Sequence, residues 1–222
     1  MTEEHATPAA HWEARYTESG KDRIWSGRVN ATVADVVQAL TPGTALDLGC
    51  GEGGDALWLA EQGWQVTGLD ISPSAVARAS AEARARGVDA SFIATDLSTW
   101  TTDDRFDLVT AAFFHSFVEL PRTEILRRAA ERVAPGGHLL LVTHAAPPPW
   151  SKHHEAHGHH PEAKFLTPEE ELTELDLHPE QWQVRIVETR PRQATGPEGE
   201  PAHLDDGVVV MRRTNQPVNG PA

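Results

Sequence analysis

The sequence predicts an α/β protein built on a doubly wound, mostly parallel β-sheet. Three features of the chain indicate this fold. Strand-like and helix-like patterns alternate from residue 44 to residue 143, and a glycine-rich turn joins the first strand to the first helix. The run DLVTAAFF, which ends at Phe114, is almost continuously apolar, as is typical of a strand buried on both faces. Strands that alternate with helices form parallel sheets with right-handed crossovers.

The elements follow from the spacing of apolar residues and from the residues that begin and end them. Strand patterns occur at 44–48, 65–69, 91–94, 106–113, 138–143, 182–189 and 207–212. Helical patterns occur at 29–40, 54–60, 72–87, 121–133 and 167–175. Ser72 is a predicted N-cap, and Thr167 opens a predicted capping box. We expect residues 1–10 to be disordered.

Charged residues on the predicted helix 72–87 have the spacing of an ordinary helix surface. Arg78, Glu82 and Arg86 stand four residues apart. Charges at this spacing usually pair with one another in solvent. We therefore expect these three side chains to form a solvated face.

The stretch Thr44–Ala60, TALDLGCGEGGDALWLA, is the most informative part of the chain. It combines a strand, a glycine loop and the start of a helix. Glycines adopt backbone angles that other residues avoid, and they let a ligand approach the main chain at a helix N-terminus. We therefore expect a cofactor site at this turn.

Two classes of cofactor fit the spacing of the loop. Gly49, Gly51 and Gly54 match the dinucleotide pattern G-x-G-x-x-G, and Asp70 follows at a suitable distance. Asp47, at the end of the strand, favours the other class, because a carboxylate repels a pyrophosphate but attracts an ammonium group. S-adenosylmethionine carries an ammonium group and no phosphate, so the sequence disfavours a nicotinamide dinucleotide.

Size and composition narrow the classes of protein further. With 222 residues, the chain is expected to form one domain. Its 19 basic and 33 acidic residues give a net charge of −14, which argues against nucleic acid as a partner. Cys50 is the single cysteine, which suits a reducing compartment. Without an apolar leader or membrane-length run, we expect a cytoplasmic protein that binds no membrane.

The stretch LDLGCGEGGDALWLA resembles motif I of the class I S-adenosylmethionine-dependent methyltransferases. Three further segments carry the resemblance, which covers roughly Val29 to Arg213: Gly68–Ser72, Thr95–Leu97 and Pro135–Gly137. Within that family the chain is most similar to the small tellurite-resistance and thiopurine-type methyltransferases.

The resemblance implies a Rossmann-like methyltransferase fold with a seven-stranded sheet that ends in an antiparallel hairpin. Residues 29–213 would form the methyltransferase domain, 1–28 an N-terminal lid or cap, and 214–222 a disordered tail. S-adenosylmethionine would be the cofactor and S-adenosylhomocysteine the product. The acceptor would be a small molecule, and the protein a monomer or homodimer.

The resemblance also assigns cofactor-binding residues. Asp70 would accept hydrogen bonds from both ribose hydroxyls, and Asp96 would bind the exocyclic amine of adenine. An apolar residue, Leu97, would line the edge of the adenine ring, and Ile71 would pack on its face or in the core. An ordinary turn aspartate remains an alternative for Asp96. The loop would contribute Asp47, Gly49, Cys50, Gly51 and Gly53.

Two histidines stand after predicted strands at the edge where the cofactor would bind. His115 and His144 are candidate general bases, with a structural role as the alternative for each. Proximity alone can suffice for methyl transfer, because the sulfonium is already activated. We expect His115 to lie nearer the glycine loop.

The acceptor is expected to meet side chains from the variable segments. These candidates are Trp12, Tyr16, Trp25, Arg28 and Trp150. The aromatic residues before Val29 would form either a lid over the ligand or a hydrophobic contact that holds the N-terminus to the core.

The histidine-rich run in HHEAHGHH, from His153 to His160, has two interpretations. It could bind a metal, or it could belong to a lid that residues 145–166 form. We expect the lid and no metal site, because prolines surround the run and no cysteine accompanies it. An alternative function for the whole chain is a module that senses S-adenosylmethionine or a metal without turnover.

Overall fold

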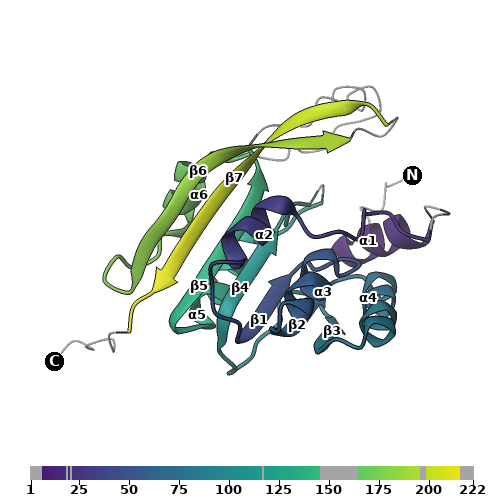
Figure 1. The fold of residues 1–222 in the computed structure, drawn as a ribbon, viewed down its shortest axis with the longest axis horizontal. Coiled ribbons are helices and arrows are strands. Elements are labelled where there is room, and N and C mark those ends of the chain that lie inside the picture. Colours follow the sequence, from purple (N-terminus) through teal and green to yellow (C-terminus); the bar gives the residue numbers. More distant parts are fainter. Residues whose placement is uncertain are drawn as a thin grey trace.

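The computed structural model describes residues 7–18, 20, 22–116, 118–145, 165–195 and 199–215. Its centre is a seven-stranded sheet in the order β3-β2-β1-β4-β5-β7-β6 (Figure 1). All neighbouring pairs are parallel except β5–β7 and β7–β6. The predicted fold class is therefore confirmed. The strands are β1 (Thr44–Leu48), β2 (Gln65–Asp70), β3 (Ala90–Ala94), β4 (Phe106–Ala112), β5 (Val133–His144), β6 (Trp182–Thr195) and β7 (Pro201–Arg213).

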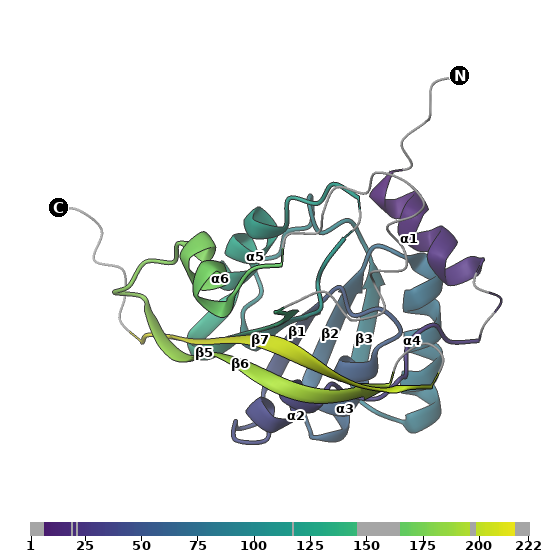
Figure 2. The same cartoon turned by 90° about the horizontal axis from the view of Figure 1, so that it is seen from above.

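Helices cover both faces of the sheet (Figure 2). They are α1 (Pro8–Thr17), α2 (Ala31–Val37), α3 (Gly54–Glu61), α4 (Pro73–Arg86), α5 (Arg122–Glu131) and α6 (Pro168–Leu175). Helices α2 and α3 pack on one face, and α5 and α6 on the other. Along β5, Leu139 and Leu141 join the core beneath α5, whereas Leu140 and Val142 join the core beneath α2. This alternation follows from the two-residue period of a strand.

Local capping signals explain where several helices begin. Ser72 accepts a hydrogen bond from Ala75 N–H at the start of α4. Thr167 and Glu170 form the predicted capping box of α6. Helix α1 begins at Pro8 with Thr7 as its N-cap, so the prediction of disorder is wrong for residues 8–10. A proline in the first turn of a helix needs no intrahelical partner, which is why it starts α1 well.

The C-terminal hairpin is longer than its apolar pattern predicts. Its register continues to the pair Thr195–Pro201, six residues beyond each predicted strand end. The added part carries a buried ion pair, in which Arg192 donates to both oxygens of Asp206 at 2.7 and 3.2 Å. Thr32 of α2 donates to the same carboxylate at 3.3 Å. These polar contacts stabilise strand pairing that an apolar pattern cannot signal.

At the C-terminal end, the described residues continue to residue 215. Thr214, assigned by the sequence to the tail, donates hydrogen bonds to the carbonyls of Gln181 and Glu180. Residues 216–222 lie outside the described residues. No helix in the described part of the chain is long and apolar enough to cross a membrane.

Candidate functional site

The loop between β1 and α3 holds a conformation that only glycine adopts easily. Gly49, Gly51 and Gly53 have φ angles of 67°, 53° and 82°. The loop is fixed to the end of β2, because Cys50 N–H donates to the carbonyl of Leu69 at 2.9 Å. The backbone is thereby presented at the carboxyl end of the sheet, where open α/β sheets bind ligands.

Asp70 connects this loop to helix α4. The side chain is 7% exposed. One carboxylate oxygen accepts from Gly51 N–H at 2.8 Å and the other from Ser72 N–H at 2.9 Å. Burial raises the pKa of this carboxyl group above its ordinary value. Since a carboxylate has about four acceptor positions, capacity remains for the two hydroxyls of a ribose.

Asp47 is a second buried acid beside the loop. It is 3% exposed and accepts a hydrogen bond from the Thr110 hydroxyl at 2.8 Å. Burial, followed by the charge of Asp55, raises the pKa of Asp47 to about 8. Burial also raises the pKa of Asp55 to about 6. A bound ammonium group would favour the ionised form of these carboxyl groups and lower their pKa values, whereas a pyrophosphate would raise the pKa values further.

The remaining predicted cofactor residues lie close by in sequence but differ in exposure. Asp96 is exposed after β3, and its carboxylate accepts from Ser98 N–H in a turn. Leu97 is 6% exposed and packs in the core beneath α5, while Ile71 is half-buried. Burial raises the pKa of the Cys50 thiol well above its ordinary value, so the thiol stays protonated.

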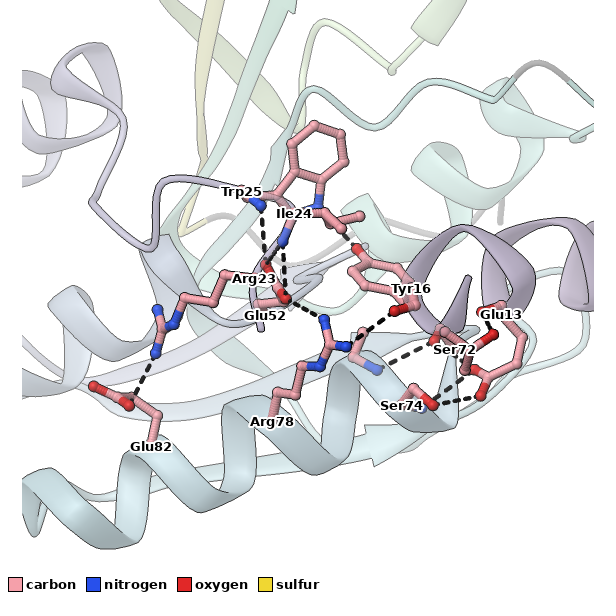
Figure 3. Close-up of polar contacts among 12 residues, drawn as sticks. Glu13, Tyr16, Arg23, Ile24, Trp25, Glu52, Ser72, Ser74, Arg78 and Glu82 are labelled. Carbon is pink, nitrogen blue, oxygen red and sulfur yellow. Dashed lines mark hydrogen bonds and ion pairs between the residues drawn. The ribbon is translucent and has the colours of Figure 1, made fainter. Parts of the chain in front are cut away.

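The N-terminal segment, which comprises α1 and the residues up to Trp25 and is called the cap below, lies directly on the glycine loop (Figure 3). Tyr16 of α1 is buried, and its hydroxyl accepts from Trp25 Nε1 at 3.0 Å. A Cβ atom at Gly51 would lie 2.9 Å from the Tyr16 hydroxyl oxygen. Gly51 is therefore needed for the close approach of the cap as well as for its own backbone angle.

Glu52 holds this cap in place, although no sequence pattern indicated a role for it. Its carboxylate is 2% exposed and accepts from Ile24 N–H and Trp25 N–H (Figure 3). Arg78 donates to Glu52 at 2.7 Å and to the carbonyl of Tyr16 at 2.9 Å. The prediction that Arg78 belongs to a solvated face is therefore wrong, because it pairs with a buried carboxylate from another element.

Further contacts join α1 to the rest of the site. Glu13 accepts from the hydroxyls of Ser72 and Ser74 at the start of α4 (Figure 3). Trp12 Nε1 donates to the Ser116 hydroxyl, beyond β4, at 3.3 Å. Thus Tyr16 and Trp25 lie against the loop, whereas Trp12 contacts the segment after β4. The predicted acceptor residue Arg28 is exposed, and its backbone carbonyl packs against Gly54.

The segment after β4 packs against the glycine loop and carries the first candidate histidine, His115. Phe113 has a φ angle of 51°, which is unusual for a bulky residue. A Cβ atom at Gly49 would lie 2.7 Å from the Phe114 ring, so this ring packs on the loop. His115 follows directly. This contact places the segment that carries His115 against the loop, and the position of His115 nearer the loop than His144 stays a prediction.

His144 lies beside His115 rather than apart from it. The His144 ring stacks on Phe113 at 4.3 Å and is nearly parallel to the His115 ring at 6.0 Å. Burial, together with Arg122, lowers the pKa of His115 to about 3. Burial also lowers the pKa of His144. Both imidazoles are therefore neutral near pH 7.

A pocket of about 350 Å³ opens beside His115. Its wall comes from the segment after β4, the start of α5, Leu166 and helix α6. Residues in this wall include His115, Ser116, Val118, Arg122, Leu166 and Glu174. Its volume lies in the range of small-molecule sites.

The predicted lid and histidine run cannot be compared with the structure. Trp150 and residues 153–160 lie outside the described residues. Among the residues that are described, no three histidine, cysteine or acidic side chains gather in a way that could hold a metal.

Asp47 makes the stability of the protein depend on pH. Its folded pKa of about 8 exceeds the ordinary value of 3.8, so the folded state binds more protons between these limits. We therefore expect the free energy of unfolding to fall as pH rises from about 4 to about 8. Asp55 and Asp70 face the same region and should add to this slope.

Urea titrations across this pH range measure the free energy of unfolding. Its dependence on pH should be weaker in Asp47→Asn and unchanged in Asp89→Asn, which alters an exposed carboxylate. Equal slopes in all three proteins would contradict the assignment.

Glu52 should control how often the cap opens. In Glu52→Gln one oxygen becomes an amide that cannot accept, so Ile24 and Trp25 N–H groups lose part of their charged partner. We expect their amide hydrogen exchange to accelerate ~10-fold. Glu61→Gln is the control, since Glu61 pairs with Arg86 on the surface. Unchanged exchange in Glu52→Gln would show that the cap is held by other contacts.

Comparison with known proteins finds relatives of the segment that carries the glycine loop. The family described as "Methyltransferase domain" matches residues 45–137, which run from β1 into β5. A ribosomal RNA small subunit methyltransferase C of Alcanivorax borkumensis is 39% identical over 52% of this chain and 38% of its own length. A 2-heptyl-1-hydroxyquinolin-4(1H)-one methyltransferase of Mycobacteroides abscessus is 35% identical over 51% and 52%. The chain thus spans between about two fifths and about half of these curated relatives.

Solved structures match over much more of the chain. A structure described as "Conversion of a Disulfide Bond into a Thioacetal Group during Echinomycin Biosynthesis" covers 93% of both chains with a TM-score of 0.72 and 26% identity. TehB of Haemophilus influenzae has the same fold, with a TM-score of 0.65 and 18% identity over 84% of this chain and 62% of its own. The glycine loop, the sheet order and these matches together support a class I S-adenosylmethionine-dependent methyltransferase.

Proposed function

We propose that this protein transfers a methyl group from S-adenosylmethionine to a small-molecule acceptor. The observation that carries the proposal is the glycine loop held by Asp70 with Asp47 buried beside it. An ionised carboxylate accepts hydrogen bonds from a ribose, and a bound ammonium group favours the ionised form of Asp47, whereas the phosphates of a dinucleotide disfavour it.

Each residue of the site then has a task in binding. Asp70 accepts from the ribose hydroxyls while it keeps the loop in place, and Asp47 faces the ammonium group. Asp96, Ile71 and Leu97 are proposed to surround the adenine. The bound cofactor supplies an activated methyl group, and the protein's part is to align the acceptor with it and to exclude water.

The cap is proposed to perform the exclusion of water. Tyr16 is buried against the loop, and Trp25 donates a hydrogen bond to the Tyr16 hydroxyl, so both side chains cover the cofactor side of the site. Burial, together with Asp70, raises the pKa of the Tyr16 phenol well above its ordinary value. The phenol therefore stays neutral and can donate a hydrogen bond.

A small acceptor is favoured over nucleic acid by charge and by the pocket. The net charge of −14 repels a phosphate backbone, and the pocket beside His115 has the size of a small-molecule site. One relative is named for an RNA and another for a hydroxyquinolinone, so the relatives alone do not decide. A thiol, a hydroxyl, an N-heterocycle or a metalloid oxyanion remains open as the acceptor. The single cysteine is consistent with a cytoplasmic reaction.

The two histidines are proposed to position the acceptor. With its pKa lowered to about 3, His115 is a weak general base near pH 7. Its neutral ring can still hold a hydrogen-bonding group of the acceptor close to the methyl group. A module that binds the cofactor without turnover would not need to position an acceptor, and the two relatives described above, which are named as methyltransferases, favour an enzyme.

Cofactor binding provides the first test. S-adenosylmethionine should bind, and Asp70→Asn should weaken binding ~10-fold or more, because one carboxylate oxygen becomes a donor. Asp89→Asn should bind as the wild type does. Isothermal titration calorimetry with S-adenosylmethionine and with NAD measures both. Tight binding of NAD without binding of S-adenosylmethionine would overturn the assignment.

The second test separates the histidines. We expect His115→Ala to lower kcat/KM ~10-fold by removing a positioning contact, and more than His144→Ala does, with cofactor affinity nearly unchanged. Because the pKa of His115 is about 3, its ionisation should produce no limb in the rate profile near neutral pH. A limb near the ordinary pKa of histidine that disappears in His115→Ala would instead identify His115 as a general base.

A further inference from the structure

The pocket beside His115 contains an arginine whose side chain is only partly satisfied. Arg122, the first residue of α5, donates from Nε to the carbonyl of Phe114 at 2.8 Å. It donates from Nη1 to Glu171 of α6 at 2.6 Å. Its Nη2 atom is buried and has no hydrogen-bond partner in the part of the chain that the structure describes. Two contacts therefore fix the guanidinium while one of its nitrogens lacks an acceptor.

The neighbouring imidazole has the same deficiency. His115 Nε2 is buried and also lacks a hydrogen-bond partner within the described residues. The two side chains line the same pocket, and the charge of Arg122 contributes to the lowered pKa of His115. An unpaired buried polar atom lowers the stability of the folded protein. Two such atoms at one pocket beside a cofactor site indicate partners supplied by a ligand.

The charges around Arg122 determine which kind of ligand fits. Glu171 is 3% exposed and already neutralises the guanidinium. Glu124 and Glu174 also line the pocket, so the balance of charge around it is negative. A full anion would be repelled, and an ammonium group would offer nothing for Arg122 Nη2 to donate to. An uncharged oxygen that accepts hydrogen bonds satisfies both conditions.

The pocket also lies where a methyl acceptor must bind. Phe114, between His115 and the end of β4, packs on Gly49 of the glycine loop. Trp12 of the cap reaches Ser116 in the pocket wall. The segment that forms this wall therefore contacts the cofactor loop through Phe114 and the cap through Ser116.

We propose that the methyl acceptor is an uncharged molecule whose carbonyl or hydroxyl oxygen binds between Arg122 and His115. Arg122 is then a residue that determines specificity, while Glu171 positions it. The inference rests on the proposed function in calling the ligand the methyl acceptor. Both nitrogens are covered by protein, so the ligand oxygen must displace part of that cover.

A matched pair of probes tests the proposal. Benzamide and benzoate have nearly the same shape, but the first presents a neutral carbonyl and the second a carboxylate. Each is titrated into the full chain with S-adenosylhomocysteine present, and the arginine side-chain signals are followed by NMR. We expect benzamide to shift the Arg122 signal saturably and to bind ~10-fold more tightly than benzoate.

Arg122→Lys is the informative variant because it leaves a cation for Glu171 but removes the forked donor. It should weaken benzamide ~10-fold, with melting temperature and S-adenosylhomocysteine affinity close to wild type. Arg127→Lys is the control, since Arg127 lies on the same helix but donates to the carbonyls of Leu175 and Glu174. If Arg122→Lys does not fold, the response of the wild-type Arg122 signal to the two probes decides alone.

The contrary outcomes are distinct from a failure of the proposed function. The inference is wrong if benzamide does not bind, if benzoate binds as tightly, or if Arg122→Lys binds benzamide like the wild type. If S-adenosylhomocysteine itself does not bind, the proposed function fails. The benzamide titration without it then still reports whether Arg122 recognises a neutral oxygen.

Discussion

The hydrogen bond from Gly51 N–H to Asp70 is the contact on which the arrangement of the site depends. It holds the glycine loop against the end of β2, and the other Asp70 oxygen accepts from Ser72 N–H. Ser72 in turn caps α4 and donates its hydroxyl to Glu13 of α1. One carboxylate thus links the loop, the neighbouring helix and the cap. Any ligand that binds to Asp70 acts on all three.

The same region concentrates carboxyl groups where burial makes their ionised form unfavourable. Asp47 and Asp55 have pKa values raised to about 8 and about 6. Glu52 is equally buried, but Arg78 and two backbone N–H groups satisfy it. The contrast separates two roles. The paired acid, Glu52, stabilises the cap. Asp47 and Asp55 have few hydrogen-bond donors and would favour a cationic ligand. Their burial lowers the stability of the protein, which is common at functional sites.

On the acceptor side, unusual backbone and unpaired side chains occur together. Phe113 adopts a positive φ angle, and this turn brings Phe114 beneath the loop and His115 into the pocket. Arg122 is held by the carbonyl of Phe114 and by Glu171, which prevents it from turning away into solvent. Strain and unsatisfied donors in one short segment are physically reasonable if a substrate compensates for them.

Much of this protein could be predicted from sequence because its signals are local. The glycines at 49–53, the acids at the strand ends and the caps at Ser72 and Thr167 act through neighbouring residues, and short patterns reveal them. Tertiary structure alone decided the contacts between distant segments. The sequence could not show that Glu52 meets Arg78, that Trp25 meets Tyr16 beside Gly51, or that Arg122 meets Glu171. A charged or aromatic side chain has the same local pattern whether it lies in solvent or pairs across the fold, and only the packing of the elements brings its partner within reach.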